Sequence, residues 1–216
     1  MDVELFDTLS FISSYLILLP CLVALFRWKE ASLLQKRILG LVLLVTLVEL
    51  MSNICWYNLI NNHPLYHVYS LCEFWLVLNI YRTSMKWMTN AVVIFAGGLF
   101  TLFAIVNSVF LQDITEFNSN VTTVSAVLII LLSLVSFFQL LTKSTHSSVF
   151  SEPQFYINSG FLIYFSSNLV LFFISSRVEL SPEEGYMIWG AHSIVNCILI
   201  IFYTIALWIQ SKEDLQ

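Results

Sequence analysis

Seven long and mostly apolar runs take up most of this 216-residue chain. An α-helix rises about 1.5 Å per residue, so about 20 residues are needed to cross the hydrocarbon core of a bilayer. The runs are close to this length, and their apolar residues are continuous rather than alternating, which argues against a transmembrane β-barrel. Their approximate bounds are 9–26, 38–60, 65–81, 91–111, 121–141, 155–174 and 186–209.

Composition leads to the same class of protein. Apolar residues make up 58% of the chain and charged residues only 11%, whereas a soluble domain carries about 25% charged residues. This balance excludes a soluble globule, a disordered chain and a nucleic-acid-binding protein. We therefore predict an all-α polytopic membrane protein, in which residues 1–216 form a single bundle of seven transmembrane helices surrounded by membrane lipids.

Basic residues predict the orientation of this bundle, because the cytoplasmic loops of membrane proteins are enriched in Lys and Arg. With the N-terminus outside and the C-terminus in the cytoplasm, Arg177 is the single basic residue on the outer side. Acidic residues, by contrast, gather in the outer segments. The cytoplasmic segments then hold Arg27, Lys29, Lys36, Arg37, Arg82, Lys86, Lys143 and Lys212.

Two carboxylates lie deep within the apolar runs. Glu49 is near the middle of the second run, and Glu73 is eight residues into the third. A charged side chain at the membrane centre costs about 2.5–3.5 kcal/mol on insertion scales, so ionisable residues inside spans are functional hypotheses by default. No Lys or Arg lies inside a run, which leaves His67 or His192 as the cationic partner of these carboxylates.

Further polar side chains recur on single faces of the predicted helices, at spacings of three and four residues. Counted from the ends of the runs, these groups fall in the outer half of the membrane or near its midplane. We therefore predict a shared polar pocket inside the bundle that binds a small or lipidic ligand. The expected ligand-binding residues are Glu49, Asn53, His67, Glu73, Asn168, His192 and Asn196.

Several functions are compatible with such a pocket. The leading hypothesis is a non-enzymatic sensor or binding module that acts through a partner protein, because the spans leave no room for an output domain within the chain. The two carboxylates would also suit a small proton-coupled transporter. A purely structural protein is a further alternative, since polar contacts between transmembrane helices contribute about 0.6 kcal/mol each and hold helices together without any ligand.

A metal-dependent hydrolase acting on lipid is the remaining alternative. We expect no cofactor, but the residues with suitable chemistry for a metal would be Glu49, His67, Glu73 and His192. Such a site resembles that of the seven-helix zinc hydrolases of the ceramidase and progestin-receptor superfamily, which carry an HxxxH pair in their last helix. In this chain Asn196 stands where the second histidine belongs, four residues after His192.

Other cofactors are constrained by the same residues. Retinal needs a lysine in the last helix to form its Schiff base, and the run 186–209 has none, so a microbial rhodopsin is excluded. His63 and His67 have the i, i+4 spacing of helical metal ligands, but Pro64 predicts that His63 caps the helix instead. A haem held between His67 and His192 is a further alternative.

Three stretches of the sequence carry a family resemblance. The first is ELMSN at 49–53 with NHPLY at 62–66 and CEF at 72–74; the second is FYINSG at 155–160 with SN at 167–168; the third is SIVN at 193–196 with YTIA at 203–206. Together they resemble an uncharacterised family of seven-helix inner-membrane proteins common in Bacteroidota. The resemblance implies a bacterial cytoplasmic membrane but brings no established activity, cofactor or partner.

Overall fold

The computed structural model describes residues 3–143, 149–177 and 181–209. This part of the chain contains helices and their connections and no strand, so the all-α prediction is confirmed. Lys212, which was counted among the cytoplasmic basic residues, and the outer acidic residues Asp2 and Glu179 lie outside the described residues. The helices are α1 (Val3–Leu16), α2 (Leu18–Arg27), α3 (Leu33–Tyr57), α4 (His63–Ser84), α5 (Asn90–Phe110), α6 (Ser119–Lys143), the short 3-10 helix η1 (Val149–Ser151), α7 (Pro153–Arg177) and α8 (Pro182–Trp208).

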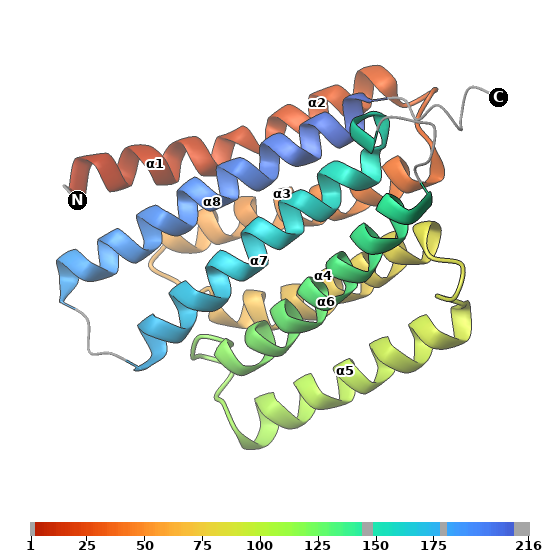
Figure 1. The fold of residues 1–216 in the computed structure, drawn as a ribbon. Helices are drawn as coiled ribbons and strands as arrows, with labels where there is room; N and C mark the ends of the chain where they lie inside the picture. Colours follow the sequence, from red (N-terminus) through yellow and green to blue (C-terminus); the bar gives the residue numbers. More distant parts are fainter. Residues whose placement is uncertain (1–2, 144–148, 178–180, 210–216) are drawn as a thin grey trace.

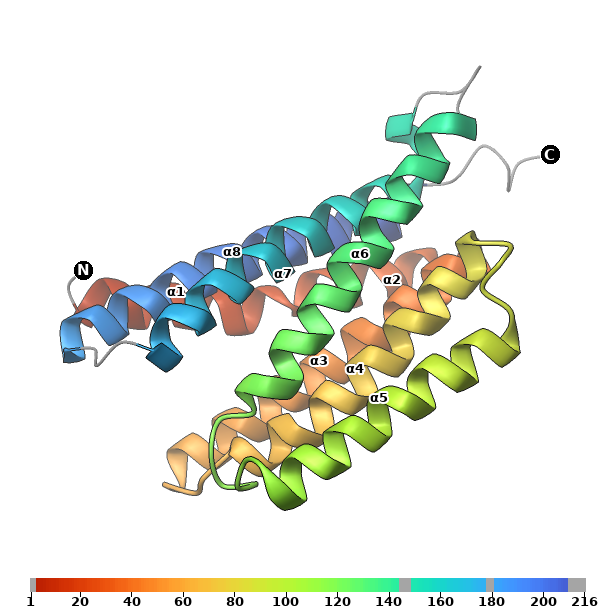
Figure 2. The same ribbon diagram turned by 60° about the horizontal axis from the view of Figure 1, so that its bottom comes forward.

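The helices form two layers that run between the same two ends of the molecule (Figures 1 and 2). One layer holds α1, α2, α7 and α8, and the other holds α3, α4 and α5. Helix α6 crosses between the layers and packs on both α7 and α4. Because α1 and α2 both pack on α8, the first and last parts of the chain lie side by side.

Five helical segments are long and apolar enough to cross a membrane. Large apolar side chains are exposed along them, such as Phe26 at 85% and Phe110 at 77%. Apolar surface of this extent is not tolerated in water but is normal against lipid, so the chain is an integral membrane protein. The five segments are Thr8–Arg27, Leu33–Tyr57, Asn90–Phe110, Ser119–Thr142 and Glu183–Trp208.

Local side chains explain where helices begin. At the start of α3, the Ser32 hydroxyl accepts a hydrogen bond from the Gln35 backbone N–H, while the Gln35 side-chain oxygen accepts one from Ser32. This capping box satisfies two amide groups that a helix start leaves unpaired. Ser181 and Glu184 form the same box at the start of α8. Helix α3 therefore begins at Leu33, before the predicted apolar run.

The first apolar run is an interrupted helix rather than a continuous one. Ile17 separates α1 from α2, three residues before Pro20. A proline lacks the N–H that would bond to the carbonyl four residues earlier, and its ring crowds that carbonyl. The carbonyl in question belongs to Leu16, the last residue of α1. Proline chemistry therefore accounts for the position of the break.

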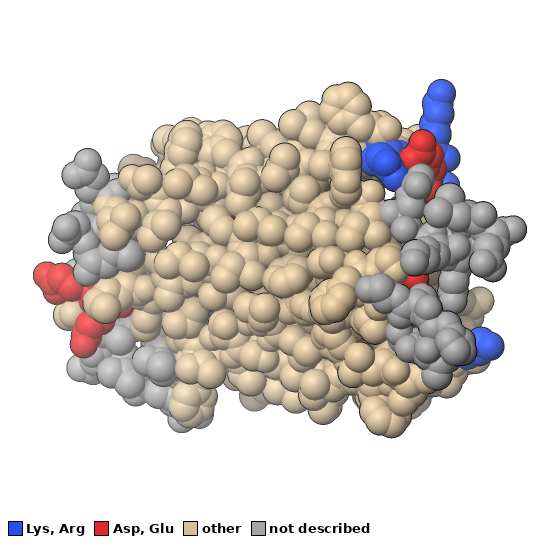
Figure 3. Space-filling view, turned by 45° about the horizontal axis from the view of Figure 1, so that its top comes forward, with Lys and Arg blue, Asp and Glu red and all other residues tan. Residues whose placement is uncertain are grey.

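Charged side chains gather at the two ends of the bundle (Figure 3). On this face Lys and Arg lie at one end only, together with a few acidic residues. A broad band of uncharged side chains separates them from the other end, where the charged side chains in view are acidic. We call the first the basic end, since it holds the α2–α3 and α4–α5 connections with Arg27 and Lys86 nearby. The opposite, acidic end holds the α3–α4 and α5–α6 connections and the start of α8.

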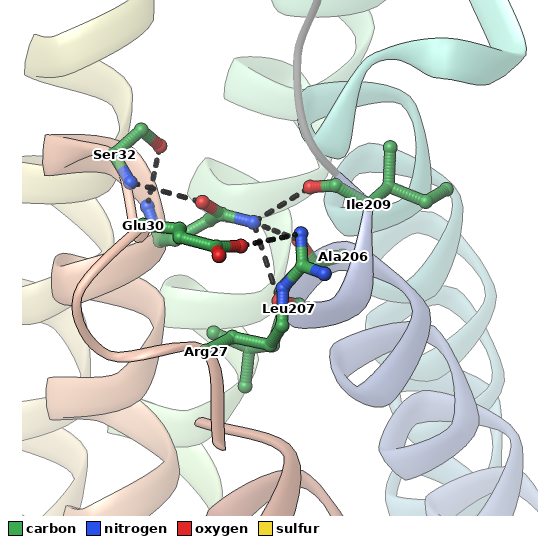
Figure 4. Close-up of polar contacts among 7 residues, drawn as sticks. Arg27, Glu30, Ser32, Ala206, Leu207 and Ile209 are labelled. Atoms are coloured by element: carbon green, nitrogen blue, oxygen red, sulfur yellow. Dashed lines mark hydrogen bonds and ion pairs between the residues drawn. The ribbon is translucent and has the colours of Figure 1, made fainter. Parts of the chain in front are cut away.

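Hydrogen bonds between Gln35 of α3 and the end of α8 join the two layers at the basic end (Figure 4), and we call this group of contacts the latch. The Gln35 amide nitrogen donates hydrogen bonds to the carbonyl oxygens of Ala206, Leu207 and Ile209, at 3.0, 3.3 and 2.7 Å. These carbonyls end α8 and have no partner within their own helix. Beside them, Arg27 pairs with Glu30 at 3.2 Å and lies 5.5 Å from the centre of the Trp208 ring.

Candidate ligand-binding cavity

An internal cavity of about 480 Å³ lies between the two layers of helices. Its walls come mainly from α3, α4, α6, α7 and α8, and it extends from Asn62 and Phe117 at the acidic end to Tyr203 in the last third of α8. None of the described residues that line it is Lys or Arg. Aromatic side chains form much of the wall, namely Trp56, Tyr66, Tyr69, Phe117, Tyr164, Phe165, Trp189 and Tyr203.

Both carboxylates of the apolar runs face this cavity; Glu73 is buried and Glu49 is half-buried. Glu49 on α3 accepts a hydrogen bond from the Ser14 hydroxyl of α1 at 3.3 Å. Glu73 on α4 accepts one from Tyr69, one helical turn earlier, with 2.5 Å between the two oxygens. At about 1.5 Å per residue, Glu73 lies roughly 15 Å from the start of α4, well inside the bundle. Each carboxylate is therefore held by a neutral hydroxyl.

A second group of polar residues lines the opposite wall. The Nδ1 atom of His192 on α8 lies 2.8 Å from the side-chain oxygen of Asn168 on α7. This contact links α7 to α8 on the cavity wall. One turn further along α8, Asn196 donates to the Ser13 hydroxyl of α1 at 2.9 Å. These bonds fix two side chains of α8 against neighbouring helices.

Two amide groups on the cavity wall are incompletely satisfied. Asn168 and Asn118 are only 3% and 2% exposed. The Asn168 nitrogen and the Asn118 oxygen have no hydrogen-bond partner within the described part of the chain. Buried polar atoms are nearly always hydrogen-bonded, and leaving one unpaired costs about 1–3 kcal/mol. These two atoms are the natural contacts for polar groups of a molecule inside the cavity.

The structure brings five of the seven expected binding residues to this one cavity. His67 and Asn53 do not line it. His67 is buried on another face of α4, where its ring nitrogens lie 3.0 Å from the Ser108 hydroxyl and 3.2 Å from the Glu116 carbonyl oxygen. Its observed contacts fasten α4 to the end of α5 and to the α5–α6 connection. The five that line the cavity are Glu49, Glu73, Asn168, His192 and Asn196.

The residues weighed as metal ligands are not assembled into one site. His67 lies away from the cavity that holds Glu49, Glu73 and His192. Within residues 3–143, 149–177 and 181–209, no group of three or more His, Cys, Asp or Glu side chains is placed to hold a metal ion. The His63 and His67 pair is also divided, since His63 lines the cavity and His67 does not.

Sequence reasoning missed several residues that line the cavity or bond to its polar side chains. Asn118 precedes α6 in what the sequence predicts as a connection, so its burial has no signal in hydropathy. Ser13 and Ser14 on α1 form hydrogen bonds with Asn196 and Glu49, respectively. Serine is common in apolar helices, so its presence in the sequence does not predict such a partner. Tyr69 lies one helical turn before Glu73, the spacing at which side chains on a helix contact each other.

Fold and cavity together define a helical integral membrane protein with an acidic, aromatic internal cavity. Comparison with protein-family models, with curated proteins and with solved structures finds no match to this chain.

Proposed function

We propose that this protein is a membrane-embedded binding module that holds a small or lipidic ligand in its internal cavity and acts through a partner protein. The observation that carries the proposal is the convergence of five polar residues, from four helices, on one cavity. Its volume of about 480 Å³ lies in the range of about 300–1,000 Å³ that is typical of ligand sites. Its mixed apolar and polar wall is also typical of such sites.

The unpaired atoms of Asn118 and Asn168 favour binding over a purely structural role. Polar groups that only hold helices together are expected to be paired with each other. Such a set does exist elsewhere in the bundle: Asn158, Gln154 and Ser136 bond to one another between α6 and α7. The cavity differs from that set because its polar atoms remain available on the wall.

Helix α8 supplies a route from the cavity to the basic end. His192 and Asn196 lie on the cavity wall, and the final carbonyls of the same helix are held by Gln35. A ligand that shifts α8 would therefore strain the latch between α8 and α3. In the proposed mechanism, a partner protein binds at the basic end, and its binding depends on the position of α8.

We further propose that the chain crosses a bacterial cytoplasmic membrane seven times, with the N-terminus outside. In this arrangement α4 and α7 are spans as well, and the basic end faces the cytoplasm. The confinement of Lys and Arg to one end of the face in Figure 3 supports this orientation, because basic residues are enriched on the cytoplasmic side. Fusing green fluorescent protein to the C-terminus should give fluorescent cells, and fusing alkaline phosphatase there should give no activity. The reverse pattern would contradict the orientation.

Filling the cavity tests the binding function. Ala126 on α6 lines the cavity and is 2% exposed, whereas its neighbour Val127 is 41% exposed on the outside of the bundle. Ala126→Phe should therefore occupy the ligand space, and Val127→Phe should add a similar side chain against lipid. After purification in mild detergent, native mass spectrometry should detect a bound molecule on the wild type and on Val127→Phe but not on Ala126→Phe.

His192→Ala provides a second variant that enlarges the cavity rather than filling it, and it should also lose the bound molecule. Thermal unfolding and circular dichroism would establish that the variants are folded. Equal occupancy of the wild type, Ala126→Phe and His192→Ala would overturn the proposed function, and so would a wild type that carries no molecule at all.

A further inference from the structure

We propose that the ligand of this cavity is an organic cation, an ammonium group carried on an apolar body. The inference rests on the proposed binding function and specifies the chemical class of its ligand. It follows from the charge balance of the wall, the aromatic surfaces around it and the unpaired acceptor of Asn118.

The charge balance of the wall is one-sided. Glu49 and Glu73 both face the cavity, and the groups that bond to them are the hydroxyls of Ser14 and Tyr69. The described lining residues include no Lys or Arg, and the basic side chains among them are the imidazoles of His63 and His192. A buried carboxylate is stabilised by a positive partner, and a bound ammonium group would supply one. An anionic ligand, by contrast, would meet two acidic side chains.

The aromatic wall favours the same class of ligand. Trp, Tyr and Phe rings attract cations to their faces, most strongly where water is excluded. Around His192, the Tyr164 and Trp189 rings lie with centroids 5.9 and 5.7 Å away, and Phe117 meets Trp189 edge to face at 6.5 Å. Rings from three parts of the chain thus surround one region of the cavity. This arrangement suits a bulky, weakly hydrated cation better than a small metal ion.

An acceptor is also available on the wall. The Asn118 side-chain oxygen is buried and has no partner within the described part of the chain, so its partial negative charge can face an ammonium group, whether or not that group has an N–H to donate. Its amide nitrogen is directed at the Ser70 hydroxyl, 3.4 Å away. The unpaired Asn168 nitrogen offers a donor for an oxygen atom elsewhere in the ligand.

Three probes of similar shape separate charge from size. Benzyltrimethylammonium is a cation, neopentylbenzene is its uncharged carbon isostere, and benzenesulfonate is an anion. Binding of each to the full-length protein in nanodiscs of phosphatidylglycerol would be measured by equilibrium dialysis, with empty nanodiscs subtracted. We expect the wild type to bind the cation about ten-fold or more tightly than the isostere and to exclude the anion.

Substitution of each carboxylate by the uncharged amide tests whether Glu49 and Glu73 cause the preference for the cation. Glu73→Gln keeps an oxygen that can accept from Tyr69 but removes the charge, and Glu49→Gln does the same beside Ser14. Both should reduce the preference for the cation while leaving the isostere bound. Glu116→Gln removes an exposed carboxylate from the α5–α6 connection and should change nothing. A preference that survives in Glu49→Gln and Glu73→Gln would overturn the inference.

The outcomes also separate this inference from the function on which it rests. If the wild type binds the isostere as tightly as the cation, the cavity binds ligands but the proposed class is wrong. If it retains no probe of any charge, the binding function itself fails. Nanodiscs with added phosphatidylethanolamine identify the source of the ammonium group, because a lipid headgroup ligand would compete with benzyltrimethylammonium and a soluble amine ligand would leave its affinity unchanged.

Discussion

The Gln35 side chain donates a hydrogen bond to the backbone carbonyl of Ile209 over 2.7 Å, joining the first turn of α3 to the end of α8. The same nitrogen also reaches Ala206 and Leu207. Gln35 is 3% exposed, so water is largely excluded from this contact. The Gln35 side chain therefore caps its own helix, α3, and also holds the end of α8.

Substitution of Gln35 should destabilise the protein in a graded way. Gln35→Met removes the hydrogen bonds without adding charge, and Gln35→Glu places a second oxygen against three carbonyl oxygens. We expect a loss of about 1 kcal/mol for the first and about 2–3 kcal/mol for the second. The free energy of unfolding, measured by SDS titration in mixed micelles, checks this order. A Gln35→Glu variant as stable as the wild type would show that the hydrogen bonds of the latch do not stabilise the protein.

Gly97 and Gly98 should differ sharply when replaced by alanine. A Cβ on Gly97 would lie 2.6 Å from ring atoms of Trp75, whereas one on Gly98 meets nothing within 4 Å. The Trp75 indole cannot move freely, because its N–H bonds to Thr101 at 3.1 Å. We expect Gly97→Ala to cost about 1–3 kcal/mol and Gly98→Ala to have little effect in the same SDS assay. Adding Trp75→Leu to Gly97→Ala should recover part of the loss.

The polar cluster around Asn158 should contribute to stability rather than to binding. Asn158 is fully buried, donates to Ser136 at 3.0 Å and accepts from Tyr81 and Gln154. Tyr81→Phe should cost about 1 kcal/mol, while Tyr156→Phe, which alters an exposed hydroxyl, should cost less. Benzyltrimethylammonium affinity should be the same in both variants. A changed affinity in Tyr81→Phe would show that the cluster and the cavity are coupled.

Asp113 gives a prediction about pH. Hydrogen bonds from the Thr115 backbone N–H, and then from its hydroxyl, lower the pKa of this exposed carboxyl below its usual value. A depressed pKa means that the bonds stabilise the fold above the ordinary pKa of Asp and are lost as pH falls through the lowered value. Thr115→Val keeps the N–H and removes the hydroxyl, so NMR titration should show the Asp113 pKa rising part of the way. An unchanged value would refute the role of the hydroxyl.

Hydropathy and helical phase predicted much of this architecture. Three of the seven apolar runs, 65–81, 121–141 and 155–174, lie wholly within one helix, and the other four are helical over most of their length. Long apolar segments in lipid must satisfy their backbone internally, which favours helix. The ends are less well predicted. Helix α3 starts earlier than the run 38–60 because the polar turn at Gln35 is helical, and α4 continues past Tyr81 to Ser84. At the start of α3 the capping box of Ser32 and Gln35, which hydropathy does not measure, determines the boundary.

Helical rotation explains which expected site residues reach the cavity. His67 precedes Glu73 by six residues, which places it about 120° away around α4 at 3.6 residues per turn. The depth of His67 in the membrane suggested that it lies at the cavity, whereas its angle around α4 places it on another face of the helix. Asn53 is a finer case, since it lies only about 40° from Glu49, but the cavity meets α3 on the side of Val45 and Val48. Sequence patterns predict which face of a helix is polar, but the packing of the neighbouring helices determines which residues of that face line the cavity.

The polar face of α4 also constrains how the chain is made. In the proposed seven-span arrangement, Glu73 shares its cavity with residues of α7 and α8, which leave the ribosome well after α4. The connection between Tyr57 and His63 is short, so α3 and α4 are expected to enter the bilayer as a pair. Until the last two helices arrive, that carboxylate must stay beside the translocon or another protein, since lipid offers it no partner. Biogenesis of this bundle is therefore expected to be completed only when α8 has been synthesised.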